Sequence, residues 1–349
     1  MQVISKKKGR QSVVFTEPPM VFSSASIVGD VEAKGPLGSR FDLILDDDTW
    51  GEKSWEKAES KMFERSVRLA AEKSKIDLNE IDCLLGGDLL NQIISASYAA
   101  RTLKIPYFGL YGACSTMTES LLISGMLIDG GFREMAACTA SSHFSTAERQ
   151  YRFPLELGNQ IPPTSQRTVT GAGCVIIGNA NKCKDGFLFK SIRITAGTIG
   201  RIVDLGITDA SNMGAAMAPA AADTISAHLQ DMNRTVDDYD LIVTGDLGKF
   251  GSEMLFDLCK EKNVDISGKH ADCGCLIYTA DQDVNCGGSG CGCSAVTLAS
   301  YYLERIENAN YDRILFLATG ALMSPSSSLQ GESIPGIAHA VVMERSCCI

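Results

Sequence analysis

The chain has 349 residues, of which 45% are hydrophobic and 21% are charged, and its formal net charge is −10. A chain of this length can bury a large core and usually forms two domains or one duplicated domain. The negative charge argues against a nucleic-acid-binding protein, because phosphate binding needs clustered Lys and Arg. No run of 18 or more apolar residues is present, so the sequence predicts no membrane-spanning helix.

The predicted elements alternate between helices and strands along the whole chain. In the first half they are helix 55–76, strand 81–85, helix 92–103, strand 107–110, helix 115–128, strand 135–140 and strand 173–178. In the second half they are strand 188–196, helix 219–232, strand 241–244, helix 253–263, helix 294–308, strand 314–319 and strand 337–344. This alternation predicts an α/β fold with largely parallel central strands that are covered by helices.

Two parts of the sequence resemble each other. Residues 81–89 (IDCLLGGDL) are echoed 158 residues later by residues 239–247 (YDLIVTGDL). Residues 112–115 (GACS) open a helical stretch, and residues 292–294 (GCS) open a similar stretch about 180 residues later. A repeat of this size indicates a duplicated α/β unit with a Cys-Ser pair at a strand-to-helix junction.

The thirteen cysteines are an odd number and are scattered through apolar segments. In a chain without a secretion signal they are expected to be reduced. A cluster at residues 273–293, with His270 nearby, raises the question of a metal site. Structural zinc favours Cys-x2–4-Cys spacing, whereas this cluster has Cys-x-Cys pairs. We therefore expect no metal site and mostly small buried thiols.

Cys114 follows a predicted strand and a glycine, at the first turn of a predicted helix. The N–H groups and positive partial charge of a helix N-terminus lower a thiol pKa and can hold an anion. A plain buried cysteine at a helix start is the alternative interpretation. The duplication favours a functional role for Cys114 over this alternative.

Several segments resemble the stage V sporulation protein AD family, which is part of the thiolase superfamily. They include residues 35–38 (GPLG), 87–92 (GDLLNQ), 112–115 (GACS), 141–143 (SSH), 146–150 (TAERQ), 204–209 (DLGITD), 217–225 (MAPAAADTI) and 287–291 (GGSGC). The similarity runs from about residue 10 to residue 345. It implies a thiolase-like fold, with duplicated βαβαβ halves at 1–183 and 184–349 in a layered α/β/α/β/α arrangement.

The resemblance also implies a function. It indicates a protein that binds dipicolinic acid (pyridine-2,6-dicarboxylate) and supports its uptake into the developing spore, where calcium can accompany the acid. The implied partners are the other stage V sporulation A membrane proteins and a second copy of the chain, paired through the strand at 136–140. The implied location is the cytosolic face of the forespore or spore, peripheral to the inner membrane.

Condensing enzymes of the superfamily need a His and an Asn, or two His, beside the cysteine. Here residues 245–248 (GDLG) follow the strand at 241–244 without an imidazole, and residues 288–295 (GSGCGCSA) lack both Asn and His. We therefore expect Cys114 to be a vestigial nucleophile in a pocket without condensing activity. Two alternatives stay open: a Cys114-dependent acyltransferase or ketoacyl synthase-like enzyme, and a structural adaptor for membrane partners.

A planar dianion needs paired cations or N–H donors and a flat apolar slot. Cys114 and its helix N-terminus can supply one anion site, and Arg201 is expected to hold the second carboxylate. An ion pair of Arg201 with Asp204 or Asp209 is the alternative, and for His143 and His339 the alternative is a structural role. The candidate ligand-binding residues are Cys114, Ser115, His143, Arg201, Asp204, Met213, Asp246, Gly290 and His339.

Overall fold

The computed structural model describes residues 5–151 and 162–346. The strands of the first half are β3 (Met20–Val28), β4 (Leu43–Ile44), β5 (Cys83–Gly87), β6 (Tyr107–Gly109), β7 (Met135–Ser142), β8 (Arg167–Thr168) and β9 (Gly171–Gly178). Its helices are α1 (Asp30–Ala33), α2 (Trp55–Lys73), α3 (Ile94–Leu103), α4 (Thr116–Asp129) and α5 (Phe144–Tyr151).

The second half repeats this alternation. Its strands are β10 (Ile192–Thr198), β11 (Leu241–Thr244), β12 (His270–Asp272), β13 (Gly288–Ser289), β14 (Arg313–Ala321) and β15 (Gly336–Arg345). Its helices are α6 (Met213–Met232), α7 (Gly248–Glu261), α8 (Cys273–Leu276), α9 (Cys291–Thr297), α10 (Leu303–Glu307) and α11 (Pro325–Leu329). No helix in the described parts of the chain combines the length and the apolar character needed to cross a membrane.

The two halves share one strand order. It is β6-β5-β7-β9-β3 in the first half and β12-β11-β14-β15-β10 in the second. In each half the first two pairings are parallel and the last two are antiparallel. The repeat seen in the sequence is therefore a repeat of topology. The expectation of largely parallel central strands was wrong, because β9 and β15 each run antiparallel to both of their neighbours.

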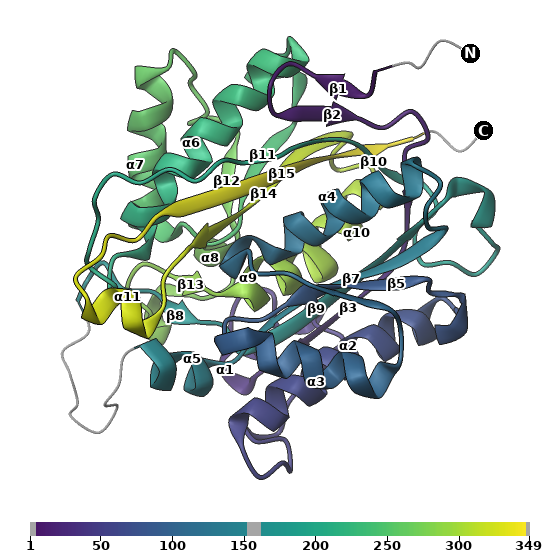
Figure 1. Ribbon diagram of the computed structural model, residues 1–349, viewed down its shortest axis with the longest axis horizontal. Helices are drawn as coiled ribbons and strands as arrows, with labels where there is room; N and C mark the ends of the chain where they lie inside the picture. Colours follow the sequence, from purple (N-terminus) through teal and green to yellow (C-terminus); the bar gives the residue numbers. More distant parts are fainter. Residues whose placement is uncertain (1–4, 152–161, 347–349) are drawn as a thin grey trace.

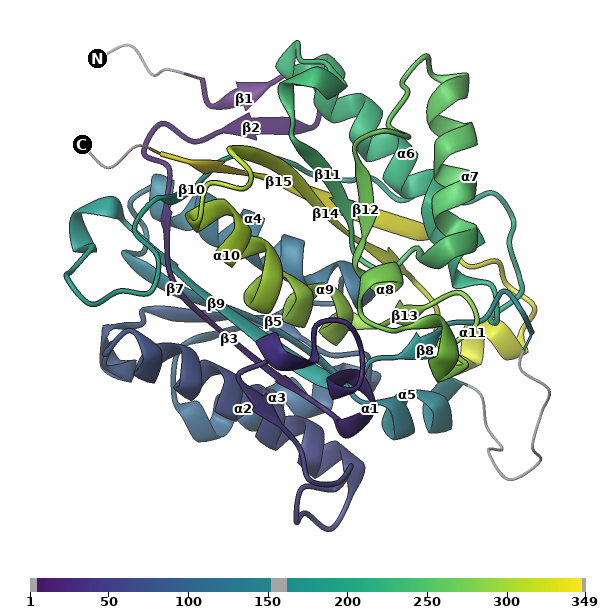
Figure 2. The same ribbon diagram turned by 180° about the vertical axis from the view of Figure 1, so that it is seen from behind.

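Helices and sheets form five layers (Figures 1 and 2). Helices α2 and α3 lie on the outer side of the first sheet, and α6 and α7 lie on the outer side of the second. Helices α4, α9 and α10 lie between the sheets, and α4 contacts both β7 and β15. This arrangement confirms the predicted α/β/α/β/α layering.

Helix α2 shows why these segments become helices. Its N-cap residue Ser54 accepts a hydrogen bond from the backbone N–H of Lys57, which satisfies one of the free donors of the first turn. Met62, Phe63 and Val67 recur at helical spacing and are buried against the sheet. Burial of this apolar stripe fixes α2 on the outer face of the first half.

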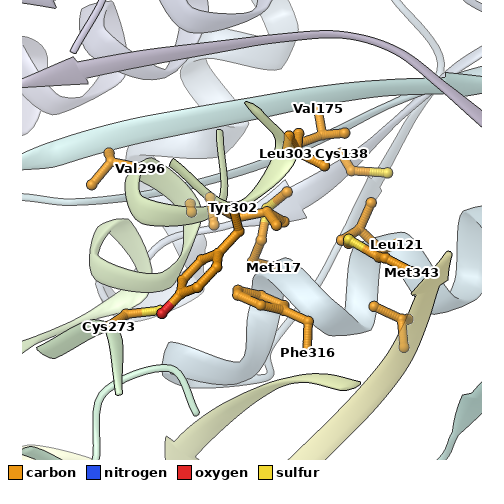
Figure 3. Close-up of a cluster of buried hydrophobic side chains, with 14 of the residues drawn as sticks. Met117, Leu121, Cys138, Val175, Cys273, Val296, Tyr302, Leu303, Phe316 and Met343 are labelled. Atoms are coloured by element: carbon orange, nitrogen blue, oxygen red, sulfur yellow. The ribbon is translucent and has the colours of Figure 1, made fainter. Parts of the chain in front are cut away.

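The central helices are apolar because they are covered on both sides. Met117 and Leu121 of α4 belong to one core cluster with Tyr302, which precedes α10, and Phe316 of β14. Figure 3 shows the ring of Tyr302 between Phe316 and Cys273. The rings of Tyr302 and Phe316 meet edge to face with centroids 6.1 Å apart. This core joins the central layer to both sheets.

The first strands of the chain belong to the second half. Strand β2 (Ser12–Val14) pairs antiparallel with β10, and β1 (Lys7–Lys8) pairs with β2. The predicted boundary at 183/184 lies in the connection between β9 and β10. The N-terminal hairpin therefore belongs to the first half by sequence but to the sheet of the second half by strand pairing.

The strand predicted to join two copies has no free edge. Strand β7 pairs with β5 on one side and with β9 on the other, so the expected contact through residues 136–140 was wrong. Strand β6 instead ends the strand order of the first half. Phe108 on β6 is 50% exposed and the nearby Tyr111 is 63% exposed.

Candidate functional site

A cavity of about 420 Å³ opens beside Cys114. Polar residues on its lining are Asp88, Asn91, Gln92, Tyr111, Glu148, Tyr151, Thr168, Ser289, Ser324 and Ser327. The remaining lining residues are Leu89, Leu90, Ile93, Ala113, Cys114, Ala147, Met213, Met217, Ala321, Leu322 and Met323. The cavity thus combines an apolar wall with carboxyl, amide and hydroxyl groups from both halves.

A tight turn positions Cys114 at the floor of this cavity. Residues Ala113–Ser115 form one 3₁₀ turn before α4, and the hydroxyl of Ser115 donates to the carbonyl of Gly112 at 2.6 Å. Ala113 has a φ of +47°, a strained backbone conformation for a residue other than glycine. Gly320 of β14 packs against this turn, where a Cβ would lie 2.4 Å from the Gly112 carbonyl oxygen. The position of Cys114 is therefore fixed by both halves.

The thiol of Cys114 is held in its neutral form. Its pKa is raised well above the ordinary value by a hydrogen bond with the Cys291 thiol, by burial and by the nearby carboxyl of Asp246. The expectation that the helix N-terminus would lower this pKa was wrong, because these three effects all oppose the thiolate. No histidine lines the cavity among the residues that the structure describes. Among the described residues, the cysteine therefore has no imidazole base beside it in the cavity.

Asp246, a residue of the second half, is hydrogen-bonded to the thiol of Cys114. It follows β11, and one carboxylate oxygen accepts from the hydroxyl of Thr319 at 2.8 Å. The other accepts from the hydroxyl of Ser289 at 3.1 Å and from the N–H of Gly290 at 2.9 Å. Burial raises the pKa of Asp246 from its ordinary value of 3.8 to about 6. Asp246 thus fixes the loop that precedes α9.

This raised pKa makes a pH-dependent prediction. Folding favours protonated Asp246, so its contribution to stability is present below about pH 4 and is lost as the pH rises through 6. An amide side chain at this position would not titrate. We expect the unfolding free energy of Asp246→Asn minus that of wild type to rise by about 1 kcal/mol from pH 5 to pH 7. Wild type loses stability over this range and the amide variant does not, and one pKa unit corresponds to about 1.4 kcal/mol. Urea unfolding at both pH values measures it.

The exposed Asp209→Asn variant is the matched control for replacing a carboxylate by an amide. An Asp246→Asn difference that is flat between pH 5 and pH 7 would contradict the assignment.

Asp88 is the counterpart of Asp246 in the first half. Its carboxylate oxygens accept from the backbone N–H groups of Leu90 and Ala96, each at 2.7 Å. Burial raises its pKa to about 6. Behind it lies the buried Glu59, whose pKa is raised well above the ordinary value by burial and by the charge of Asp88. The two carboxyl groups disfavour a second negative charge, so the pair retains a proton more readily than isolated acids do.

The structure brings part of the predicted site together. Cys114 and Met213 line the cavity, and Asp246 and Gly290 lie directly beneath its floor. Ser115 is buried just behind Cys114. These five residues come from strand ends and helix starts of both halves.

Arg201 is not part of this cavity. Its guanidinium makes a two-point ion pair with Asp223 of α6, at 2.8 and 2.5 Å. It lines a separate surface cleft with Arg10 and Lys262. The structure therefore does not bring Arg201 to the cavity beside Cys114, where it was expected to hold the second carboxylate. The alternative, an ion pair of Arg201 with Asp204 or Asp209, is wrong because Arg201 pairs with Asp223 instead. Asp204 accepts from the hydroxyl of Ser333, and Asp209 accepts from the N–H of Ser211.

The two candidate histidines are bound to backbone groups. The Nε2 of His143 is 2.6 Å from the carbonyl oxygen of Asp48. The Nδ1 of His339 accepts from the N–H of Gly200 at 3.1 Å, and burial lowers the pKa of His339 to about 4. Neither lines the cavity. The structure therefore does not bring either ring into the cavity with Cys114, and backbone partners from distant segments hold both rings.

Sequence reasoning missed other residues of the site. Cys291 lay within a quoted motif, but the motif alone does not show which of its two thiols faces Cys114. The wall formed by residues 321–327 follows β14 and has no sequence signal of its own. The sequence also suggests that Arg152 lies over the mouth of the site or at a dimer contact, but this residue lies outside the described residues. Within the described ranges, no three His, Cys, Asp or Glu side chains are arranged to hold a metal ion.

Comparison with known families decides the assignment. A model of the family described as stage V sporulation protein AD matches residues 9–344. The chain belongs to this family. The stage V sporulation protein AD of Bacillus subtilis (strain 168) is 48% identical over 341 residues, which cover 98% of each chain. The predicted family is confirmed, and the chain is a sporulation protein.

More distant solved structures share the fold. OleA of Xanthomonas campestris with bound cerulenin is 15% identical, with a TM-score of 0.61 over 94% of this chain and 97% of that one. Human mitochondrial 3-ketoacyl-CoA thiolase in complex with CoA is 12% identical, with a TM-score of 0.60 over 96% and 99%. The 3-oxoacyl-[acyl-carrier-protein] synthase III of Aquifex aeolicus VF5 is 15% identical, with a TM-score of 0.56 over 93% and 99%. The predicted thiolase-like fold is confirmed.

Proposed function

We propose that this sporulation protein binds dipicolinic acid in the Cys114 cavity and supports its uptake into the developing spore, without catalysing a condensation. The observation that carries the proposal is an open cavity in a thiolase-like fold whose cysteine is neutral and has no imidazole beside it. A binding site retained without its catalytic partners suits a protein that captures a small acid. The proposed location is peripheral to the spore inner membrane, on its cytosolic face, with the other stage V sporulation A membrane proteins as partners.

The apolar wall suits a flat ring. Met213, Met217 and Met323 line the cavity together with Ile93 and Leu322. Thioether groups make favourable contacts with aromatic rings and adapt to their outline. A volume of about 420 Å³ lies within the range of small-molecule sites, so a single pyridine dicarboxylate fits.

The charge of the lining favours the acid together with calcium. Asp88 and Glu148 line the cavity, while no Lys, Arg or His does so among the described residues. A bare dianion would meet like charge at Asp88. Its one-to-one complex with Ca²⁺ carries no net charge, and Ca²⁺ prefers oxygen ligands. We therefore propose that dipicolinate enters this cavity as its calcium complex.

Calorimetric titration of dipicolinate, with and without equimolar Ca²⁺, tests the proposal. Wild type should bind saturably and at least tenfold more tightly with Ca²⁺. Leu322→Trp, which adds bulk to the half-buried cavity wall, should weaken binding at least tenfold, or about 1.4 kcal/mol. Arg201→Ala should bind as wild type does, because Arg201 lines a different cleft.

Folding of each variant is checked by circular dichroism. The absence of binding to folded wild type would refute the proposed ligand. Equal weakening by Arg201→Ala and Leu322→Trp would refute the assigned cavity.

A Cys114-dependent acyltransferase is the second candidate, because Cys114 does line the cavity. It predicts a thioester on Cys114 after incubation with an acyl-CoA, detected as added mass that Cys114→Ala abolishes. The neutral state of the thiol argues for no such adduct.

We also propose that two copies pair through β6. Its outer edge has no strand neighbour among the described residues, and an unpaired edge with an exposed aromatic side chain favours strand addition. Phe108→Lys should shift the dimer to monomer, seen as a halved mass in light scattering after size-exclusion chromatography. Phe132→Lys, at an exposed aromatic residue outside any strand, is the control. A monomeric wild type would contradict the pairing.

A further inference from the structure

Two thiols meet beside the cavity, one from each half of the fold: Cys114 lines the cavity and Cys291 is buried next to it. Cys114 lies just before α4, and Cys291 is the first residue of α9. The Sγ of Cys291 donates to the carbonyl oxygen of Ala113 at 2.9 Å. The Cys291 thiol is also hydrogen-bonded to the Cys114 thiol. Nothing in the proposed binding of a dicarboxylate requires this second thiol.

The neighbouring thiols face elsewhere. Cys293 directs its Sγ towards the carbonyl oxygen of Gly245, at 3.5 Å. Cys286 directs its Sγ towards the carbonyl oxygen of Pro163, at 3.2 Å. Among these motif cysteines, Cys291 is the one placed against Cys114.

Cys114 is reachable by small molecules because it lines an open cavity. A disulfide needs two sulfur atoms that can approach to about 2 Å with little movement of the backbone. Thiols already in hydrogen-bond contact meet this condition after side-chain rotation.

We propose that Cys114 and Cys291 form a reversible disulfide when a peroxide enters the cavity. The Cys114 thiol loses its proton, and the thiolate attacks one oxygen of hydrogen peroxide. An S–O bond forms as the O–O bond breaks, which gives a sulfenic acid, and the leaving hydroxide takes up the proton that the thiol released and becomes water. The sulfur of Cys291 then attacks the sulfenic sulfur, an S–S bond forms, and a second water leaves. Overall the two thiols lose two electrons and two protons, and the peroxide is reduced to two waters. A dithiol reverses the step by exchange.

The oxidation should be slow at neutral pH and faster at higher pH. The thiolate is the attacking species, and burial together with the Cys291 and Asp246 contacts keeps Cys114 protonated. The disulfide would join the starts of α4 and α9 and so tie the two halves together across the cavity floor.

Peptide mapping of the full chain tests the disulfide directly. Reduced protein is treated with hydrogen peroxide, the remaining thiols are blocked with N-ethylmaleimide, and the digest is examined by mass spectrometry. Wild type should yield one linked peptide pair containing Cys114 and Cys291, lose two of its thirteen titratable thiols, and recover both with dithiothreitol. Cys293→Ser should keep the linked pair.

Cys291→Ser and Cys114→Ser should each lose the linked pair, and Cys291→Ser should leave Cys114 as a sulfenic acid that dimedone traps. If one variant does not fold, the other carries the test. The proposal is overturned if folded wild type forms no Cys114–Cys291 link, or if Cys114 links to a different cysteine.

An effect of the disulfide on ligand binding rests on the proposed function and is measured separately. Oxidised wild type should bind calcium dipicolinate at least tenfold more weakly than reduced wild type, while oxidised Cys291→Ser provides the control. The peptide map does not depend on that ligand, so failure of one proposal is distinguishable from failure of the other.

Discussion

Replacement of Phe316 by alanine is expected to lower the free energy of unfolding by about 3–5 kcal/mol, the usual cost of removing a fully buried phenylalanine. Phe316 is 0% exposed on β14 and packs edge to face on Tyr302 (Figure 3). The central helices and both sheets surround this cluster, so the space left by the ring cannot collapse easily. Urea or guanidinium unfolding, followed by circular dichroism at 25 °C, measures the loss.

Phe132→Ala is the matched control, because Phe132 is 70% exposed. We expect it to change the unfolding free energy by no more than about 0.5 kcal/mol. A loss below about 1 kcal/mol for Phe316→Ala would show that this core is not packed as described.

Replacement of Asp272 by alanine is expected to cost at least about 3 kcal/mol, since each unsatisfied buried polar group costs about 1–3 kcal/mol. One carboxylate oxygen accepts from the hydroxyl of Thr244 at 2.7 Å and from the N–H of Leu247 at 2.9 Å. The other accepts from the N–H groups of Gly248 at 3.0 Å and Cys275 at 3.1 Å. Without Asp272 the three backbone N–H groups lose their acceptor, while the hydroxyl of Thr244 keeps its contact with Nε2 of His270 at 2.8 Å.

The same change should disturb the cavity, because the turn held by Asp272 contains Asp246. Asp272→Asn keeps one acceptor oxygen and should lose about half as much stability. Chemical unfolding compares the two variants, and titration with calcium dipicolinate compares their sites. Equal stability of Asp272→Ala and wild type would contradict the role assigned to this carboxylate.

The fold could be predicted largely because hydrophobic patterns and repeats are local in sequence. Residues 81–85 and 241–244 were each expected as buried strands, and they became β5 and β11, the repeat-related strands of the two sheets. Strand direction was not predictable in the same way. A buried strand has the same apolar composition whether its neighbour runs parallel or antiparallel, so the reversal at β9 and β15 needed the structure.

The site was predictable only where motif residues also occupy strand ends or helix starts. Cys114, Asp246 and Gly290 come together because the fold converges there. The position of Arg201 was not predictable in this way. Its partner Asp223 lies on α6, 22 residues further along the chain, and only the packing of α6 brings the two side chains together. The contact between Cys291 and Cys114 depends on the direction in which α9 enters the central layer.

The pairing of β2 with β10 bears on the order of events during synthesis. About 180 residues separate Val14 from Ile192, so at 5–20 residues per second the hairpin waits about 10–35 s for its partner strand. The ribosome therefore releases the whole first sheet while β2 still has an open edge. Strand β1, with its two exposed lysines, covers only the other edge of β2, so the edge that faces β10 stays unpaired until residues 192–198 have been made.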